Sequence, residues 1–207
     1  MNSHLARAPV AAGHSLTGAR MVGVLVHGRD QDQSTMLDVV ERLKLDDVAY
    51  ILPVAANRSW YPGRYFDPVT ENEPYLSWAI EACEVALATA RAAGVPDQRI
   101  VLGGFSQGAC VVAELLARGS PPIAGAAVLT GSLLGRPAER TPAPLDGLRM
   151  FFALSRYDEW IALADAQATA QAFERMGAVV VFEIYEDREH HISDQALAGL
   201  RTLLTAR

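Results

Sequence analysis

Short runs of hydrophobic residues alternate along the chain with longer stretches in which hydrophobic positions recur every three or four residues. Each short run has the length and composition of a strand buried on both faces of a sheet; the runs are 21–26, 49–54, 100–102, 123–129, 148–154 and 178–185. The periodic stretches predict helices at about 38–45, 74–93, 109–118, 163–176 and 194–204. Strands that alternate with helices at this spacing indicate βαβ units, so we expect an α/β fold with a mostly parallel sheet flanked by helices.

Turn-forming and capping residues set the expected ends of these elements. Asn72 or Thr70 can cap the helix at 74–93, and Gly94 can end it. Residues 135–144 are rich in Pro and Gly and are expected to form a loop. We expect one domain over residues 1–207, in which residues 1–19 are loosely structured or form an edge strand, and the chain leaves no room for a large cap domain.

Composition narrows the class of protein. Half of the 207 residues are hydrophobic and 20% are charged, which is ordinary for a globular enzyme. The net charge of −6 and the lack of a basic run argue against nucleic acid or an anionic membrane surface as partner. The sequence has no stretch that resembles a signal peptide or a membrane-spanning helix, so we expect a cytoplasmic protein without stable membrane insertion. Cys83 and Cys110 are interpreted as small core residues.

The pentapeptide Gly104-Phe105-Ser106-Gln107-Gly108 joins the predicted strand at 100–102 to the helix that follows. Glycines at both ends of such a turn let strand and helix approach closely, and the serine projects above the sheet as a nucleophile. The alternative is an ordinary turn in which Ser106 only caps the helix. The strand–turn–helix context favours the nucleophile.

A serine nucleophile needs a base, and the base needs a carboxylate that orients it. Functional groups gather beyond the carboxyl ends of parallel strands. Asp158 follows the strand at 148–154, with Glu159 as its neighbour and competitor. His190 and His191 both follow the last strand, and either can be the base. The order Ser, Asp, His along the chain is that of the α/β-hydrolases.

Two backbone N–H groups are expected to stabilise an oxyanion. The residue after the nucleophile, Gln107, supplies one, and the loop after the first buried strand supplies the other through Arg29. His27 stands in the same loop, where we expect a buried ring that braces the loop rather than a base.

The segment 57–66 contains four aromatic residues broken by Pro62 and Gly63. It is either a lid over the edge of the core or a wall of a substrate pocket, and the two are compatible. We expect side chains from this loop and one later leucine to contact the substrate: Trp60, Tyr61, Tyr65, Phe66 and Leu133.

The chain resembles the phospholipase/carboxylesterase family of α/β-hydrolases, which includes acyl-protein thioesterases and small bacterial carboxylesterases. The resemblance runs from Val22 to about Leu200 and rests on His27-Gly28, Trp60-Tyr61-Pro62, Gly104-Phe105-Ser106-Gln107-Gly108-Ala109, Asp158 and the terminal histidine. It implies an ester hydrolase that needs no metal or cofactor. It also makes a homodimer plausible, and it selects His190, two residues before Ile192, ahead of His191.

The sequence departs from the family pattern at three positions. Asp30 stands where the family often has a small residue or glycine, and Ser155 and Glu189 stand where it usually or often has glycine. We expect these differences to affect substrate preference and loop conformation more than the type of reaction.

Together these features predict a serine carboxylesterase that cleaves short- to medium-chain carboxylic esters through an acyl-enzyme, with a small-molecule ester as substrate. A thioesterase or lysophospholipase could use the same groups. A binding protein without activity, or a lyase or transferase on the same fold, are the alternatives from other classes.

Overall fold

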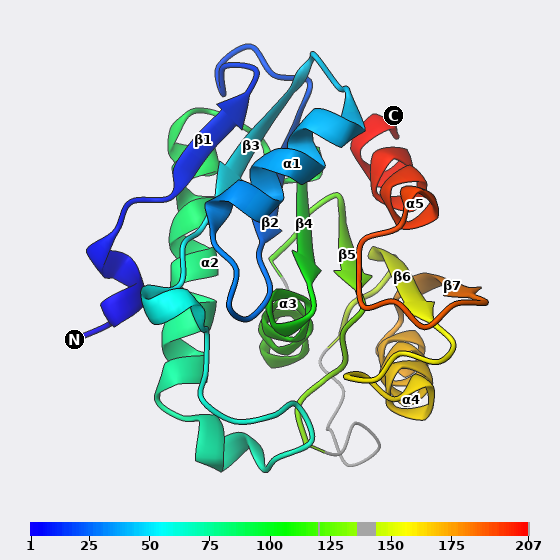
Figure 1. The fold of residues 1–207 in the computed structure, drawn as a ribbon. Helices are drawn as coiled ribbons and strands as arrows, with labels where there is room; N and C mark the ends of the chain where they lie inside the picture. The colour runs from blue at the N-terminus through cyan, green and yellow to red at the C-terminus, as the bar shows by residue number, and fades with distance from the viewer. Residues whose placement is uncertain (120, 136–143, 207) are drawn as a thin grey trace.

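The computed structural model describes residues 1–119, 121–135 and 144–206. Its centre is a seven-stranded sheet in the order β1-β3-β2-β4-β5-β6-β7 (Figure 1). The strands are β1 (Val10–Gly13), β2 (Met21–Val26), β3 (Val48–Leu52), β4 (Ile100–Phe105), β5 (Gly125–Leu129), β6 (Arg149–Ser155) and β7 (Val179–Tyr185). All neighbouring strands are parallel except β1, which pairs antiparallel with β3 at one edge.

The six hydrophobic runs of the sequence all form strands, and the mostly parallel sheet is confirmed. Four of these strands, β2 to β5, are buried at every position, as continuous runs of hydrophobic residues predict. Within residues 1–19, the segment Val10–Gly13 forms an edge strand, and a short 3₁₀-helix at Ser3–Ala6 precedes it.

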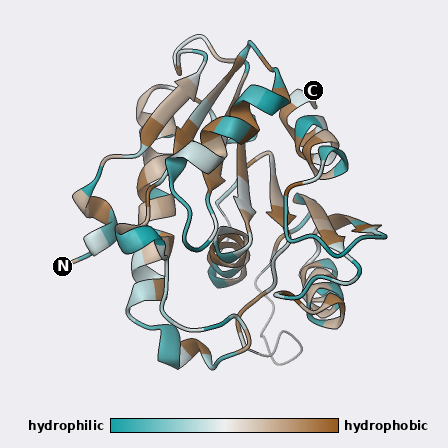
Figure 2. Ribbon diagram, in the orientation of Figure 1, coloured by the Kyte–Doolittle hydropathy of each residue, from teal (hydrophilic) through white to brown (hydrophobic). Residues whose placement is uncertain are grey.

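In the described part of the chain, five α-helices cover the sheet: α1 (Gln33–Leu43), α2 (Tyr75–Ala92), α3 (Gln107–Arg118), α4 (Leu163–Arg175) and α5 (Asp194–Thr205). Helices α1 and α5 pack on one face, and α2, α3 and α4 pack on the other (Figure 1). Each face has its own hydrophobic core, and hydrophobic residues colour much of the central strands (Figure 2). None of the helices in the described residues is long and apolar enough to cross a membrane.

Two helix starts differ from expectation. Helix α1 begins five residues before the expected Asp38, because the Asp32 side chain caps it by accepting a hydrogen bond from Ser34 N. The N-cap residue of helix α2 is Pro74, and the first-turn N–H of Ser77 donates to the Glu73 carboxylate at 3.1 Å, so the caps expected from Asn72 and Thr70 are wrong. The Asn72 side chain is buried and accepts a hydrogen bond from Gly63 N at 2.8 Å instead. Of the expected loop at 135–144, residues 136–143 lie outside the described part of the chain.

The turn between β4 and α3 is packed tightly against the first parallel strand. A Cβ atom on Gly108 would lie closer than 3.0 Å to the carbonyl oxygens of Val26 and His27, and one on Gly104 would meet the Gly108 carbonyl. Only glycine fits at these two positions, so α3 can start directly above the carboxyl ends of β2 and β4. This close packing fixes the height of Ser106 above the sheet.

Candidate active site

Ser106 occupies the turn between β4 and α3 with φ of 53° and ψ of −121°. This left-handed backbone conformation is costly for a residue with a side chain and is typical of functional turns. Its side chain does not cap α3, so the structure speaks against the reading of Ser106 as a simple helix cap. The Ser106 Oγ atom lies 2.8 Å from His190 Nε2 instead.

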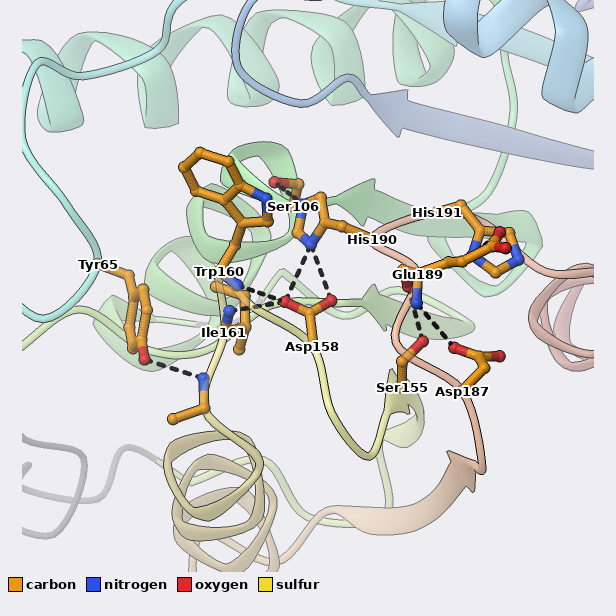
Figure 3. A network of polar contacts seen from close by, with 11 residues as sticks. Tyr65, Ser106, Ser155, Asp158, Trp160, Ile161, Asp187, Glu189, His190 and His191 are labelled. Carbon is orange, nitrogen blue, oxygen red and sulfur yellow. Dashed lines mark hydrogen bonds and ion pairs between the residues drawn. The ribbon is translucent and has the colours of Figure 1, made fainter.

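His190 links Ser106 to Asp158 (Figure 3). Its Nδ1 atom lies 2.8 Å from Asp158 Oδ2 and 3.1 Å from Asp158 Oδ1. A carboxylate only accepts, so Nδ1 carries the proton in this arrangement and Nε2 is left to accept from the Ser106 hydroxyl. The three residues expected from the ends of β4, β6 and β7 are therefore brought together in one chain of hydrogen bonds.

The Asp158 carboxylate is fully buried and is held from its own loop. Asp158 Oδ1 accepts hydrogen bonds from the backbone N–H groups of Trp160 and Ile161, each at 2.8 Å (Figure 3). These two donors fix the orientation of the carboxylate toward His190. The neighbouring Glu159 is exposed.

The two adjacent histidines have different surroundings. The His191 ring turns away from Ser106, and its Nδ1 atom lies 3.6 Å from Glu189 Oε2 (Figure 3). The loop that carries His190 is tied to the end of β6, because the Ser155 hydroxyl donates a 2.8 Å hydrogen bond to the Glu189 carbonyl. The Ser155 side chain thus holds the backbone next to His190.

The two residues expected to form an oxyanion hole, Arg29 and Gln107, line the same cavity as Ser106. Gln107 is the first residue of α3, so its N–H has no partner within the helix. Within the described residues, neither the Arg29 N–H nor the Gln107 N–H donates a hydrogen bond. Both groups are thus free to bind an oxygen atom next to Ser106.

The side chains of the same two residues hold the loop at 59–63. Gln107 Oε1 accepts from Trp60 N at 2.9 Å, and Gln107 Nε2 donates to the Tyr61 carbonyl at 2.7 Å. The Arg29 guanidinium donates to the carbonyls of Tyr61, Pro62 and Gly63. The loop at 59–63, called the aromatic loop below, is therefore fixed to the two residues, Arg29 and Gln107, whose backbone N–H groups are free.

The cavity at Ser106 has a volume of about 280 Å³. Its walls are hydrophobic rings and side chains with charged groups among them: Arg29, Asp30, Gln31, Tyr61, Gly63, Arg64, Tyr65, Phe105, Ser106, Gln107, Cys110, Trp160, Ile161 and His190. Of the expected substrate contacts, Tyr61 and Tyr65 line it. The other three do not, and their surroundings explain why.

The Trp60 side chain is fully buried, and its Nε1–H donates to the His27 carbonyl at 2.8 Å. Leu133 is fully buried in the core on the α2–α4 side of the sheet. Phe66 is exposed and packs edge-on against Tyr65 at a ring distance of 5.3 Å. The expectations for Trp60 and Leu133 are corrected, because neither side chain is exposed to a ligand. Phe66 lies outside the cavity wall, and its contact with a substrate stays a prediction.

Two buried histidines brace the aromatic loop from behind. His27 Nε2 accepts from Ala55 N at 3.1 Å, and His4 Nδ1 accepts from Ala56 N at 2.9 Å. Their rings pack against Trp60 at 4.9 and 5.3 Å. Burial lowers the pKa of both histidines, so both rings remain neutral acceptors. His27 thus has the bracing role expected of it, whereas His4 was not anticipated.

Several cavity residues were missed by sequence reasoning. Trp160 and Ile161 lie two and three residues after Asp158, so the loop after the expected aspartate was a usable signal for both. Phe105 directly precedes Ser106, Cys110 lies one turn after it on α3, and Arg64 belongs to the segment 57–66, so the signal for these three lay in stretches that the sequence had already singled out. Among the described residues, no group of three or more His, Cys, Asp or Glu side chains could hold a metal ion.

A mostly parallel sheet with a serine at the strand–turn–helix junction defines the class of α/β-hydrolases. A family model for phospholipase/carboxylesterase matches residues 15–206. The chain belongs to this family and is an ester hydrolase.

Solved structures with similar folds include a phospholipase/carboxylesterase from Dyadobacter fermentans, which is 28% identical, with a TM-score of 0.87 over 96% of this chain and 97% of that one. A carboxylesterase from Mesorhizobium loti is 22% identical, with a TM-score of 0.73 over 93% and 92% of the two chains. SOBER1 from Arabidopsis thaliana is 18% identical, with a TM-score of 0.76 over 90% and 98%. The last two likenesses concern the fold.

Proposed function

We propose that the protein is a serine carboxylesterase in which Ser106 is the nucleophile, His190 the base and Asp158 the residue that orients His190. The observation that carries the proposal is the unbroken line of 2.8 Å contacts from Ser106 Oγ through His190 to Asp158 Oδ2. Membership of an ester hydrolase family agrees with it.

In acylation, His190 Nε2 takes the Ser106 proton while Oγ attacks the ester carbonyl carbon. The carbonyl oxygen becomes an oxyanion, and the N–H groups of Arg29 and Gln107 stabilise it. The imidazolium of His190 is stabilised by the buried Asp158 carboxylate. It then gives its proton to the departing alcohol oxygen, so the C–O bond breaks and the acyl group remains on Ser106.

In deacylation, His190 takes a proton from a water molecule that attacks the acyl-enzyme. The same two N–H groups stabilise the second oxyanion, and His190 returns the proton to Ser106. The products are the carboxylic acid and the free enzyme. Every group that this cycle requires belongs to the chain itself.

The cavity supports esters of short to medium acyl chain as substrates. Its volume of about 280 Å³ limits how much of a ligand it encloses, and the rings of Tyr61, Tyr65 and Phe105 give it hydrophobic walls. Longer chains would extend past the loops into solvent.

A fluorophosphonate probe tests the proposal, because it reacts covalently only with an activated serine. The expected result is one mass adduct per chain on the wild-type protein, mapped to Ser106 by peptide analysis. Failure to label, in a folded protein, would support the alternative of a hydrolase-fold binding protein. Matched oxygen and sulfur esters then distinguish a carboxylesterase from a thioesterase by their relative kcat/KM.

A further inference from the structure

Two arginines line the cavity, and their guanidinium groups differ in what they contact. That of Arg29 is engaged by three backbone carbonyls of the loop at 61–63. That of Arg64 lies over the ring of Trp160, with Cζ 5.2 Å from the ring centroid. Arg64 is exposed, and it forms no ion pair with any residue in the described ranges. Its N–H donors are therefore available to a ligand.

The stack on Trp160 gives the Arg64 guanidinium a defined place. Trp160 is held beside Asp158, because its N–H donates to the carboxylate at 2.8 Å, and its ring lies 6.2 Å from the ring of His190 (Figure 3). A guanidinium over an aromatic face keeps its edge donors free for a planar anion. Arg64 thus presents unpaired charge on the His190 side of Ser106.

The position of Arg64 relative to His190 decides which part of a substrate it contacts. In the proposed reaction, His190 Nε2 donates a proton to the departing alcohol oxygen, so the alcohol portion lies toward His190. Trp160 packs against His190 on that side, and Arg64 follows Trp160 outward. The acyl portion, by contrast, stays bound to Ser106 after the alcohol has left.

Other charges near the cavity do not neutralise Arg64. Asp67 Oδ2 accepts a hydrogen bond from the Arg64 backbone N–H at 2.6 Å. This carboxylate oxygen is therefore engaged by the main chain of Arg64 and not by its guanidinium. Asp30 is the one carboxylate residue among those that line the cavity in the described part of the chain. It follows Arg29, and its carboxylate forms no ion pair with Arg64. Asp30 therefore opposes an anion without blocking the Arg64 donors.

We propose that Arg64 recognises an anionic group, a carboxylate or a phosphate, in the alcohol portion of the ester substrate. This inference rests on the proposed esterase function. It identifies Arg64 as a specificity-determining residue of the site and makes esters of anionic alcohols the preferred substrates.

The test uses three aryl acetates that share one acyl group: 4-acetoxybenzoate, 4-acetoxyphenyl phosphate and the neutral 4-acetoxybenzamide. For each, kcat/KM is measured with wild type and with Arg64→Gln. The ratio of the two enzymes cancels the intrinsic reactivity of each ester. The ion pair between Arg64 and the anionic group of the ester is exposed to solvent and therefore weak. We expect Arg64→Gln to lower kcat/KM about two- to fivefold for the two anionic esters and to leave kcat/KM for 4-acetoxybenzamide unchanged.

Arg188→Gln is the matched control, because Arg188 also stacks over an exposed ring, that of Tyr157 at 5.2 Å, yet does not line the cavity. It should leave all three rates unchanged, and Arg64→Lys should retain part of the preference. The Asp30→Asn variant should raise the rates on both anions. The preference should also shrink as salt is added, because exposed charges are screened.

Equal ratios for anionic and neutral esters would overturn the inference, as would an equal effect of Arg188→Gln. In either case Ser106-dependent turnover of the neutral ester would leave the proposed function intact. A larger effect on the carboxylate than on the phosphate would identify a carboxylate ligand, and the reverse a phosphate ligand. Absence of turnover with every ester would contradict the proposed function itself.

Discussion

The Ser155 hydroxyl donates a 2.8 Å hydrogen bond to the carbonyl of Glu189, which joins the end of β6 to the loop that carries His190. Ser155 is buried, and Glu189 precedes the residue whose ring reaches Ser106. The bond therefore restrains the position of His190 by fixing the peptide group that precedes it. The restraint depends on the Ser155 side chain, because the Glu189 group that accepts the bond is its backbone carbonyl.

Replacement of Ser155 by Ala should lower kcat while leaving KM nearly unchanged, because the loss acts through the position of His190. One hydrogen bond contributes about 1 kcal/mol, so we expect roughly a fivefold decrease in kcat. Steady-state kinetics on a p-nitrophenyl ester measure it. Ser132→Ala is the control: it removes a buried hydroxyl that bonds Thr169 at 2.9 Å, far along the chain from His190, and should reduce stability without a selective loss of kcat.

Gln107 is expected to act through both its backbone and its side chain. Gln107→Ala keeps the N–H but leaves the buried Trp60 N–H without an acceptor, at a cost of about 1–3 kcal/mol in the free energy of unfolding. The loop at 59–63 loses both of its Gln107 contacts, while those of Arg29, His27 and Asn72 remain, so KM should rise most for the longer esters. Urea denaturation and a chain-length series measure the two effects. A wild-type KM across the series would show that the side chain does not shape the cavity.

The Tyr65 hydroxyl bridges the aromatic loop to the loop of Asp158. It accepts from Ala162 N at 3.1 Å and donates to Asp165 Oδ2 at 2.8 Å, and burial raises its pKa to about 12, so it stays protonated (Figure 3). Tyr65→Phe should cost about 1–2 kcal/mol of stability and lower kcat several-fold. The exposed Tyr75→Phe variant is the control and should match wild type in both measurements.

Acid should destabilise the protein through His4 and His27. Burial holds the pKa of both below the ordinary value of 6.5, so between pH 6.5 and their lower folded-state values the unfolded chain binds protons that the folded protein does not. The free energy of unfolding therefore falls as the pH drops through this window, and this contribution is constant above it. Thermal unfolding of His4→Asn should depend less steeply on pH there. The exposed His14→Asn variant should retain the wild-type slope.

The sequence predicted the sheet well, because strands buried on both faces leave continuous hydrophobic runs with little ambiguity. It also predicted which strand ends bring Ser106, Asp158 and His190 together, since parallel strands end at one edge. The catalytic roles of these residues remain a prediction. Their geometry in the structure is what the predicted roles require.

The sequence could not predict features that depend on how loops pack. Asn72 resembled a helix cap, but its amide is used by Gly63 in a neighbouring loop. Trp60 and Tyr61 are adjacent aromatic residues and both are buried, but only Tyr61 lines the cavity, while the Trp60 indole donates to the His27 carbonyl. Arg64 and Trp160 meet across nearly a hundred residues of sequence, which no local pattern records.

The most direct measurement of the central claim is hydrolysis of p-nitrophenyl esters, from acetate to laurate, by wild type and Ser106→Ala. We predict turnover by the wild type, greatest for short to medium acyl chains, and a loss in the variant of about 10⁶-fold in kcat, as removal of a nucleophile produces. The variant should keep the fold, as circular dichroism would verify. No turnover by the wild type, or unchanged turnover by Ser106→Ala, would contradict the account.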